Sequence, residues 1–103
     1  MKPPARKRTC LHLVVQSSPR TVDNCRAQFD AGDAVLFLDD GVMHLVNDIS
    51  CSFRAPFAEC CFSAVDLEAR GLSGLAQAAG AVTLTDSKIA DLLQTHDFCL
   101  TWK

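Results

Sequence analysis

The segment GDAVLFLDDG, residues 32–41, contains the run that best indicates the fold class: consecutive apolar residues from Ala34 to Leu38, between two polar turns. A strand with one face in water alternates apolar and polar residues, whereas a strand covered on both faces can be apolar throughout. The run therefore predicts an interior strand of a parallel sheet with helices on both faces.

Other segments on either side alternate in the same way between strand and helix patterns. Pro19 suits the first turn of a helix with Ser18 as its N-cap, and Thr85 offers an N-cap to a later helix. This alternation indicates an α/β domain with a mostly parallel sheet. We expect strands at residues 11–15, 34–38, 57–65, 81–84 and 98–102, helices at 19–29, 42–46, 66–71 and 88–95, and an irregular segment at 47–56.

The composition is that of one globular domain. The chain has 103 residues, of which 49% are hydrophobic and 21% charged, and its formal net charge is -2. Because a dedicated nucleic-acid binder carries a basic excess, the charge argues against direct DNA binding. The basic residues Lys2, Arg6, Lys7 and Arg8 concentrate in residues 1–9, which we expect to form a flexible tail before a single domain at 10–103.

No apolar run approaches the length of a membrane span. The basic tail followed by Leu11–Val15 loosely resembles a signal peptide, but the apolar part is too short and His12 interrupts it. We therefore expect a cytoplasmic protein with no membrane partner.

The cysteine pattern favours reduced thiols over disulfides or metal ligands. No C-x-x-C motif occurs, and the adjacent pair Cys60-Cys61 lacks the spacing of a zinc site. We expect no metal, and no nucleotide cofactor, since the chain has no glycine-rich phosphate loop. Cys51 is expected to be the most exposed thiol and Cys99 a structural one.

Cys25 admits two interpretations. Val22, Cys25 and Phe29 recur at helical spacing and so share one stripe, which favours a thiol that packs in the core. A reactive thiol remains the alternative, although Cys25 lies too far from the helix start for the dipole to lower its pKa.

Sites in open α/β sheets form beyond the carboxyl ends of the strands, which directs attention to Asp39, Asp40 and Gly41. Because adjacent strand residues point to opposite faces, we expect the two aspartates not to serve one site. His44 is the histidine best placed to line a cleft, whereas His12 is expected to be a hydrogen-bonded structural residue.

The order LHLVVQSSP (residues 11–19), a cysteine at 25, GDAVLFLDDGV (32–42), DLEARGL (66–72) and HDFCLTW (96–102) resembles the TusB/DsrH family. These are small subunits of DsrE/DsrF/DsrH-type sulfur-relay complexes. The resemblance implies a three-layer α/β/α fold around a five-stranded sheet. It also implies heterohexamers with TusC/DsrF-like and TusD/DsrE-like sister subunits, which relay persulfide sulfur toward 2-thiolation of the tRNA wobble uridine or in sulfur oxidation.

The resemblance further places the cysteine of DsrH-type members at Cys25. In TusD/DsrE sister subunits the sulfur-accepting cysteine lies shortly before an Arg-Gly that resembles Arg70-Gly71, whereas Ser63 to Asp66 occupy that region here. The chain therefore resembles the subunit that lacks the main acceptor thiol. Further residues of a cleft or interface would be Asp40, Gly41, His44, Asp66, Arg70 and Trp102.

Three functions follow from these observations. The first is an accessory subunit of a cytoplasmic sulfurtransferase complex serving tRNA thiolation, with tRNA contacted only indirectly. The second is a persulfide carrier in sulfur-oxidation trafficking that uses Cys25, and the third is a small-ligand-binding α/β module near Asp40 and His44. Four apolar residues are expected to form either an interface or part of the core: Leu45, Phe53, Phe57 and Trp102. If they form an interface, the isolated chain could self-associate.

Overall fold

The computed structural model describes residues 8–47 and 60–103, and its strands and helices alternate along the chain. In chain order the elements are β1 (Cys10–Val14), α1 (Pro19–Gln28), β2 (Ala34–Phe37), η1 (Asp39–Met43), α2 (His44–Asn47), β3 (Cys60–Ser63), α3 (Ala64–Ala69), α4 (Ser73–Ala78), β4 (Val82–Leu84), α5 (Asp86–Thr95) and β5 (Phe98–Trp102).

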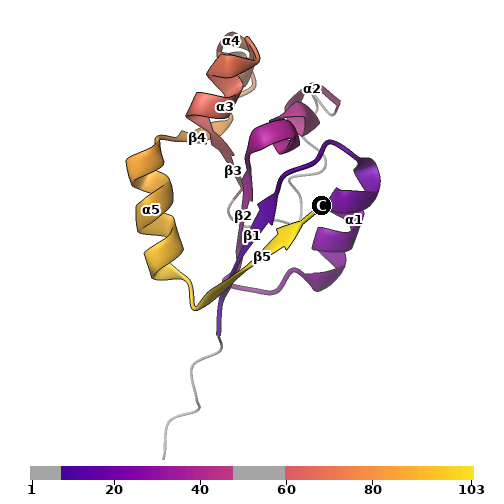
Figure 1. The fold of residues 1–103 in the computed structure, drawn as a ribbon, viewed down its shortest axis with the longest axis vertical. Coiled ribbons are helices and arrows are strands. Elements are labelled where there is room, and N and C mark those ends of the chain that lie inside the picture. The colour runs from indigo at the N-terminus through magenta and orange to yellow at the C-terminus, as the bar shows by residue number, and fades with distance from the viewer. Residues whose placement is uncertain (1–7, 48–59) are drawn as a thin grey trace, which may run out of the picture.

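The five strands form one sheet in the order β4-β3-β2-β1-β5, and every neighbouring pair is parallel. Helices α1 and α5 lie on opposite sides of this sheet (Figure 1). The expected three-layer α/β fold is therefore confirmed, and the mostly parallel sheet that we predicted is parallel throughout.

The interior strand β2 explains the continuous apolar run. All four of its residues are fully buried. Val35 and Phe37 pack on the side of α1, in one cluster that also takes residues from α2, α3 and α4. Ala34 and Leu36 face the opposite side, where Ile89 and Leu92 of α5 pack against them. Since both faces of β2 are covered, no position along it favours a polar residue.

The predicted helix boundaries hold where capping residues set them. Pro19 occupies the first turn of α1, and the Thr85 hydroxyl accepts a hydrogen bond from the Lys88 N–H at the start of α5. Ser18 takes the N-cap position of α1 but makes no side-chain capping bond. The helical segment after β3 divides into α3 and α4 because Gly71 adopts a φ of +68°, which ends a helix.

Burial bears on two of the packing expectations. Leu45 is fully buried, which agrees with the core alternative for this residue. Cys99, expected to be structural, is exposed on the edge strand β5. Strand β5 lies at the border of the sheet, and no residue of β5 belongs to the cluster packed under α5.

Residues 1–7 of the basic tail and residues 48–59 lie outside the described part of the chain. The second range contains Cys51, Phe53 and Phe57, so the expectations for these three residues stay predictions.

Candidate functional site

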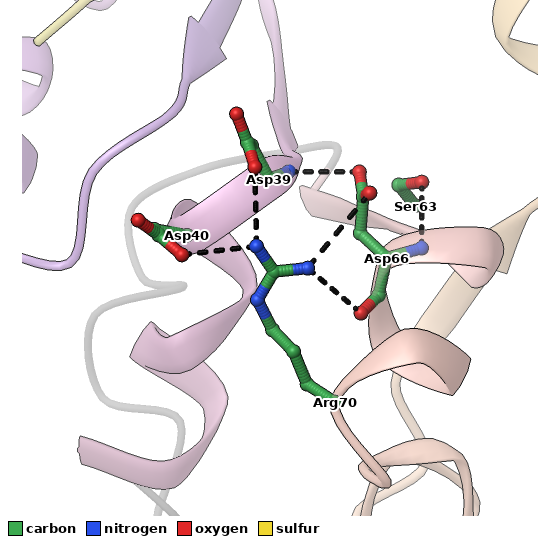
Figure 2. Close-up of polar contacts among 5 residues, drawn as sticks. All are labelled: Asp39, Asp40, Ser63, Asp66 and Arg70. Carbon is green, nitrogen blue, oxygen red and sulfur yellow. Dashed lines mark hydrogen bonds and ion pairs between the residues drawn. The ribbon is translucent and has the colours of Figure 1, made fainter.

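An ion-pair cluster joins the carboxyl ends of the adjacent strands β2 and β3 (Figure 2). The Nη2 atom of Arg70 lies 3.1 Å from Oδ1 of Asp39 and 2.9 Å from Oδ1 of Asp40. Its Nη1 donates to the Asp66 backbone carbonyl at 3.2 Å and lies 3.9 Å from that residue's carboxylate. One guanidinium thus connects η1, which follows β2, to α3, which follows β3.

Local backbone geometry places these side chains. Asp39 adopts a φ of +54°, a left-handed conformation that aspartate tolerates better than most residues, and its N–H donates to Oδ2 of Asp66 at 2.8 Å. The Ser63 hydroxyl accepts from the Asp66 N–H and so caps α3. These contacts fix the Asp66 carboxylate between the two turns.

The two aspartates converge, which corrects the expectation that they point to opposite faces. Strand β2 ends at Phe37, and Asp39 and Asp40 already belong to the 3-10 turn η1. The alternation of strand side chains no longer applies there.

Gly41 allows η1 to approach β1. A Cβ atom at this position would lie 1.9 Å from the Val14 carbonyl oxygen. The same carbonyl accepts a hydrogen bond from the Leu38 N–H at 3.1 Å, so the turn is held against the end of β1. Gly41 is therefore required for backbone packing and contributes no group of its own to the surface.

The electrostatics of the cluster suit binding better than catalysis. The hydrogen bond that Arg70 donates to Asp40 and, after it, the one that it donates to Asp39 raise the pKa of Arg70, which stays charged. The carboxylates of Asp39 and Asp40 are 73% and 69% exposed, and with Asp66 they outnumber the single guanidinium by three to one. The cluster therefore presents an excess of carboxylate groups at the sheet edge.

His44 does not join this cluster. Its side chain is buried, and Nε2 lies 2.8 Å from the Gln16 carbonyl oxygen, to which it donates. Burial lowers its pKa, which keeps the ring neutral near pH 7. The structure thus places His44 in the core between α2 and the loop after β1.

Cys25 points into the core from α1 and is fully buried. Burial raises the pKa of its thiol to about 12, and burial likewise raises that of Cys10 to about 11. Because the thiolate is the nucleophilic form, neither sulfur is activated in this conformation.

A hydrogen-bond network joins strand β5, strand β1 and the turn that precedes β2. Trp102 Nε1 donates to Nδ1 of His12 at 3.0 Å, which leaves Nε2 of His12 to carry the proton and donate to Asp33 at 2.9 Å. Burial alone would raise the pKa of Asp33, but hydrogen bonds from His12 and from the backbone N–H groups of Cys10 and Asp30 outweigh it and lower the pKa.

The sequence indicated that His12 is hydrogen-bonded but did not identify either partner. Trp102, expected at a cleft or interface, is half-buried and its ring stacks on His12 with 6.0 Å between ring centroids. No sequence spacing signals this contact, because 90 residues separate the two side chains.

An open cavity of about 440 Å³ lies between α3, α4 and β4. Ser73, Gln77 and Thr83 supply its polar side chains, and none of the predicted cleft or interface residues lines it. In residues 8–47 and 60–103, no group of three histidine, cysteine or acidic side chains is arranged to hold a metal ion.

The fold and this edge together define a small parallel α/β domain with paired charges beyond the carboxyl ends of two adjacent strands. A family model described as DsrH like protein matches residues 16–97. The chain therefore belongs to the DsrH-like family, as the resemblance to TusB/DsrH predicted. No curated protein matches the chain.

Family membership identifies the chain as a TusB/DsrH-type sulfur-relay subunit, a class that generally forms a complex with DsrE- and DsrF-like partners. Among the helices of the described residues, none combines the length and apolar character needed to cross a bilayer.

Proposed function

We propose that this chain is an accessory subunit of a cytoplasmic heterohexameric sulfur-relay complex that serves 2-thiolation of the tRNA wobble uridine. In this role it supports DsrE- and DsrF-like sister subunits and does not itself carry sulfur. The observation that carries the proposal is the state of Cys25, whose side chain is fully buried and whose thiol pKa is raised to about 12. A thiol in that state neither attacks a persulfide nor meets an incoming thiolate.

The ion-pair cluster supports the same conclusion from a second direction. The resemblance places the acceptor cysteine of the DsrE-like sister shortly before the position of Arg70. Here Ser63 caps α3 and Asp66 binds Arg70, so the corresponding turn is occupied by structural contacts. The nearest thiol, Cys61, is buried in β3.

The burial of Cys25 also bears on which pathway the complex serves. A carrier in sulfur-oxidation trafficking would use the cysteine at this position, and that use requires an accessible thiolate. Because Cys25 is a packing residue, we favour the tRNA branch, in which the sister subunit holds the persulfide.

The decisive experiment co-expresses the chain with DsrE- and DsrF-like subunits from its host and incubates the purified complex with a persulfide donor. We expect a mass increase of one sulfur atom on the DsrE-like subunit and none on this chain. Cys25→Ala should leave the transfer rate unchanged, whereas substitution of the sister's acceptor cysteine should abolish it. A one-sulfur increase on the Cys25 peptide would overturn the accessory role.

The pathway is tested separately in the host. Deletion of the gene should remove 2-thiouridine from the affected tRNAs, as measured by nucleoside mass spectrometry, and the Cys25→Ala variant should restore it. Normal 2-thiouridine in the deletion strain, together with impaired sulfur oxidation, would assign the chain to the other branch.

A further inference from the structure

Strand β5 is an open border of the sheet. It pairs with β1 on one side, and among the described residues no strand pairs with its other side. Its five residues, FCLTW, include no charged side chain, and Phe98 and Leu100 are 40% and 41% exposed. Natural edge strands are usually protected by charges, proline or bulges, so an unprotected edge of this length is suited to pairing with another strand.

The backbone of β5 has a free row of hydrogen-bonding groups. Phe98 N–H donates to the Thr9 carbonyl at 3.3 Å, and the Trp102 carbonyl accepts from Val15 N–H at 3.2 Å. Because successive residues of a strand direct their backbone groups to opposite sides, Cys99 and Thr101 direct their N–H and C=O groups away from β1.

From this arrangement we infer that β5 pairs with β5 of a second copy of the chain, antiparallel, about a two-fold axis at Leu100. In this register Cys99 lies opposite Thr101 of the second copy and exchanges both backbone hydrogen bonds with it. The two-fold axis repeats the exchange, which gives four bonds and a continuous ten-stranded sheet. Leu100 meets its own symmetry mate in the closer, non-hydrogen-bonded type of pair.

Side-chain chemistry selects this register. Asp97 and Lys103 flank β5, and the two-fold at Leu100 sets each at the register position opposite the other, so that both ends of the pair bring opposite charges together, although the Asp97 carboxylate already accepts a hydrogen bond from the Thr9 N–H at 2.7 Å. A shift by one residue in each copy would place Cys99 opposite Cys99 and leave Lys103 beyond the pairing. The same register puts Phe98 opposite Trp102 on the α1 face, although the Arg8 guanidinium already covers part of the Phe98 ring at 5.0 Å.

The other border of the sheet lacks these properties. Strand β4 has only three residues, and its exposed apolar side chain, Val82, is 52% exposed. A strand of that length offers fewer outward backbone groups, and its sequence is not flanked by complementary charges. Val82 therefore provides a matched control for Leu100.

Because a five-residue strand pair forms a small interface, we expect a weak dimer whose population depends on concentration. Sedimentation velocity of the full chain alone, from about 5 to about 500 µM, should show a monomer that converts to a dimer. Leu100→Glu sets two carboxylates at the axis, and Thr101→Pro removes an outward N–H without touching the ladder to β1. Each should weaken dimerisation by about tenfold or more, whereas Val82→Glu should leave it unchanged.

Cross-linking tests the register. In a non-hydrogen-bonded antiparallel pair the Cα atoms lie about 4.5 Å apart, within the range of a disulfide. The double variant Cys99→Ser, Leu100→Cys, oxidised with glutathione disulfide at high concentration, should form a dimer linked through position 100. Circular dichroism confirms that each variant is folded.

Three results would overturn the inference. One is a monomer at all concentrations, a second is a wild-type dimer linked by Cys99 to Cys99, and a third is a dimer that Leu100→Glu and Thr101→Pro leave intact. Loss of sister-subunit binding in Leu100→Glu, with the isolated chain monomeric, would assign the edge to a DsrE- or DsrF-like partner instead. The sedimentation and cross-linking experiments use the chain alone, so their outcome is independent of the sulfur-relay proposal.

Discussion

Replacing Trp102 by phenylalanine keeps an aromatic ring against His12 but removes the indole N–H. In the wild type that N–H donates to Nδ1 of His12, whose side chain is fully buried. The substitution leaves a buried acceptor without its partner, which costs about 1–3 kcal/mol, and the smaller ring gives up part of its packing. We expect a loss of about 2 kcal/mol in the free energy of unfolding.

For a domain of this size, about 2 kcal/mol corresponds to a fall in Tm of roughly 10 °C. Urea unfolding followed by far-ultraviolet circular dichroism measures the change without relying on tryptophan fluorescence, since Trp102 is the single tryptophan. Thr101→Val, on the same strand, is the matched control and should shift stability by less than about 0.5 kcal/mol.

A double-mutant cycle tests the cause. Because His12→Phe removes the acceptor, Trp102→Phe should cost about 1 kcal/mol less in that background than in the wild type. If the two costs are equal, or if Trp102→Phe alone changes stability by no more than the Thr101 control, the hydrogen bond does not stabilise the fold as reasoned.

Three further predictions concern the core and its thiols. Gly41→Ala should lower the free energy of unfolding, measured in urea, by about 3 kcal/mol, because the alanine Cβ would lie 1.9 Å from a β1 carbonyl oxygen. A near-neutral result would show that η1 can shift away from β1. Burial lowers the pKa of His44, so the unfolded chain binds the proton first and stability is lost as pH falls below about 6.5. The urea midpoint should therefore be lower at about pH 5 than at about pH 7.5, and His44→Gln should reduce this difference. An equal difference in the variant would contradict the reasoning. In timed alkylation with mass spectrometry, exposed Cys99 should react early while Cys25, with its pKa raised to about 12, stays unmodified in the native protein; early labelling of Cys25 would contradict its burial.

The inward position of Cys25 was predictable because helical spacing with Val22 and Phe29 is a local property of the chain. The extent to which its thiol is protonated was not, because burial depends on the strands beneath α1. The same distinction explains the error at Asp39 and Asp40. Alternation of side chains holds only within a strand, but both residues follow the strand expected at 34–38, and contacts of η1 with Arg70 and with the end of β1 hold them in a 3-10 turn.

The family's motif order located the region of the acidic cluster but not its geometry. Arg70 contacts Asp39 and Asp40 across 31 and 30 residues, and Asp66 reaches the Asp39 N–H across 27. Only the parallel pairing of β2 with β3 brings those turns together, since it places the carboxyl ends of both strands at one edge.

By itself, the sequence determined the features that depend on near neighbours: the apolar run of β2, the starts of α1 and α5, and the helix break at Gly71. Tertiary structure alone decided the Arg70 cluster, the His12 network and the open border at β5. The physical reason is that periodicity and capping act over a few residues, whereas these sites join groups whose distance is set by strand order and register.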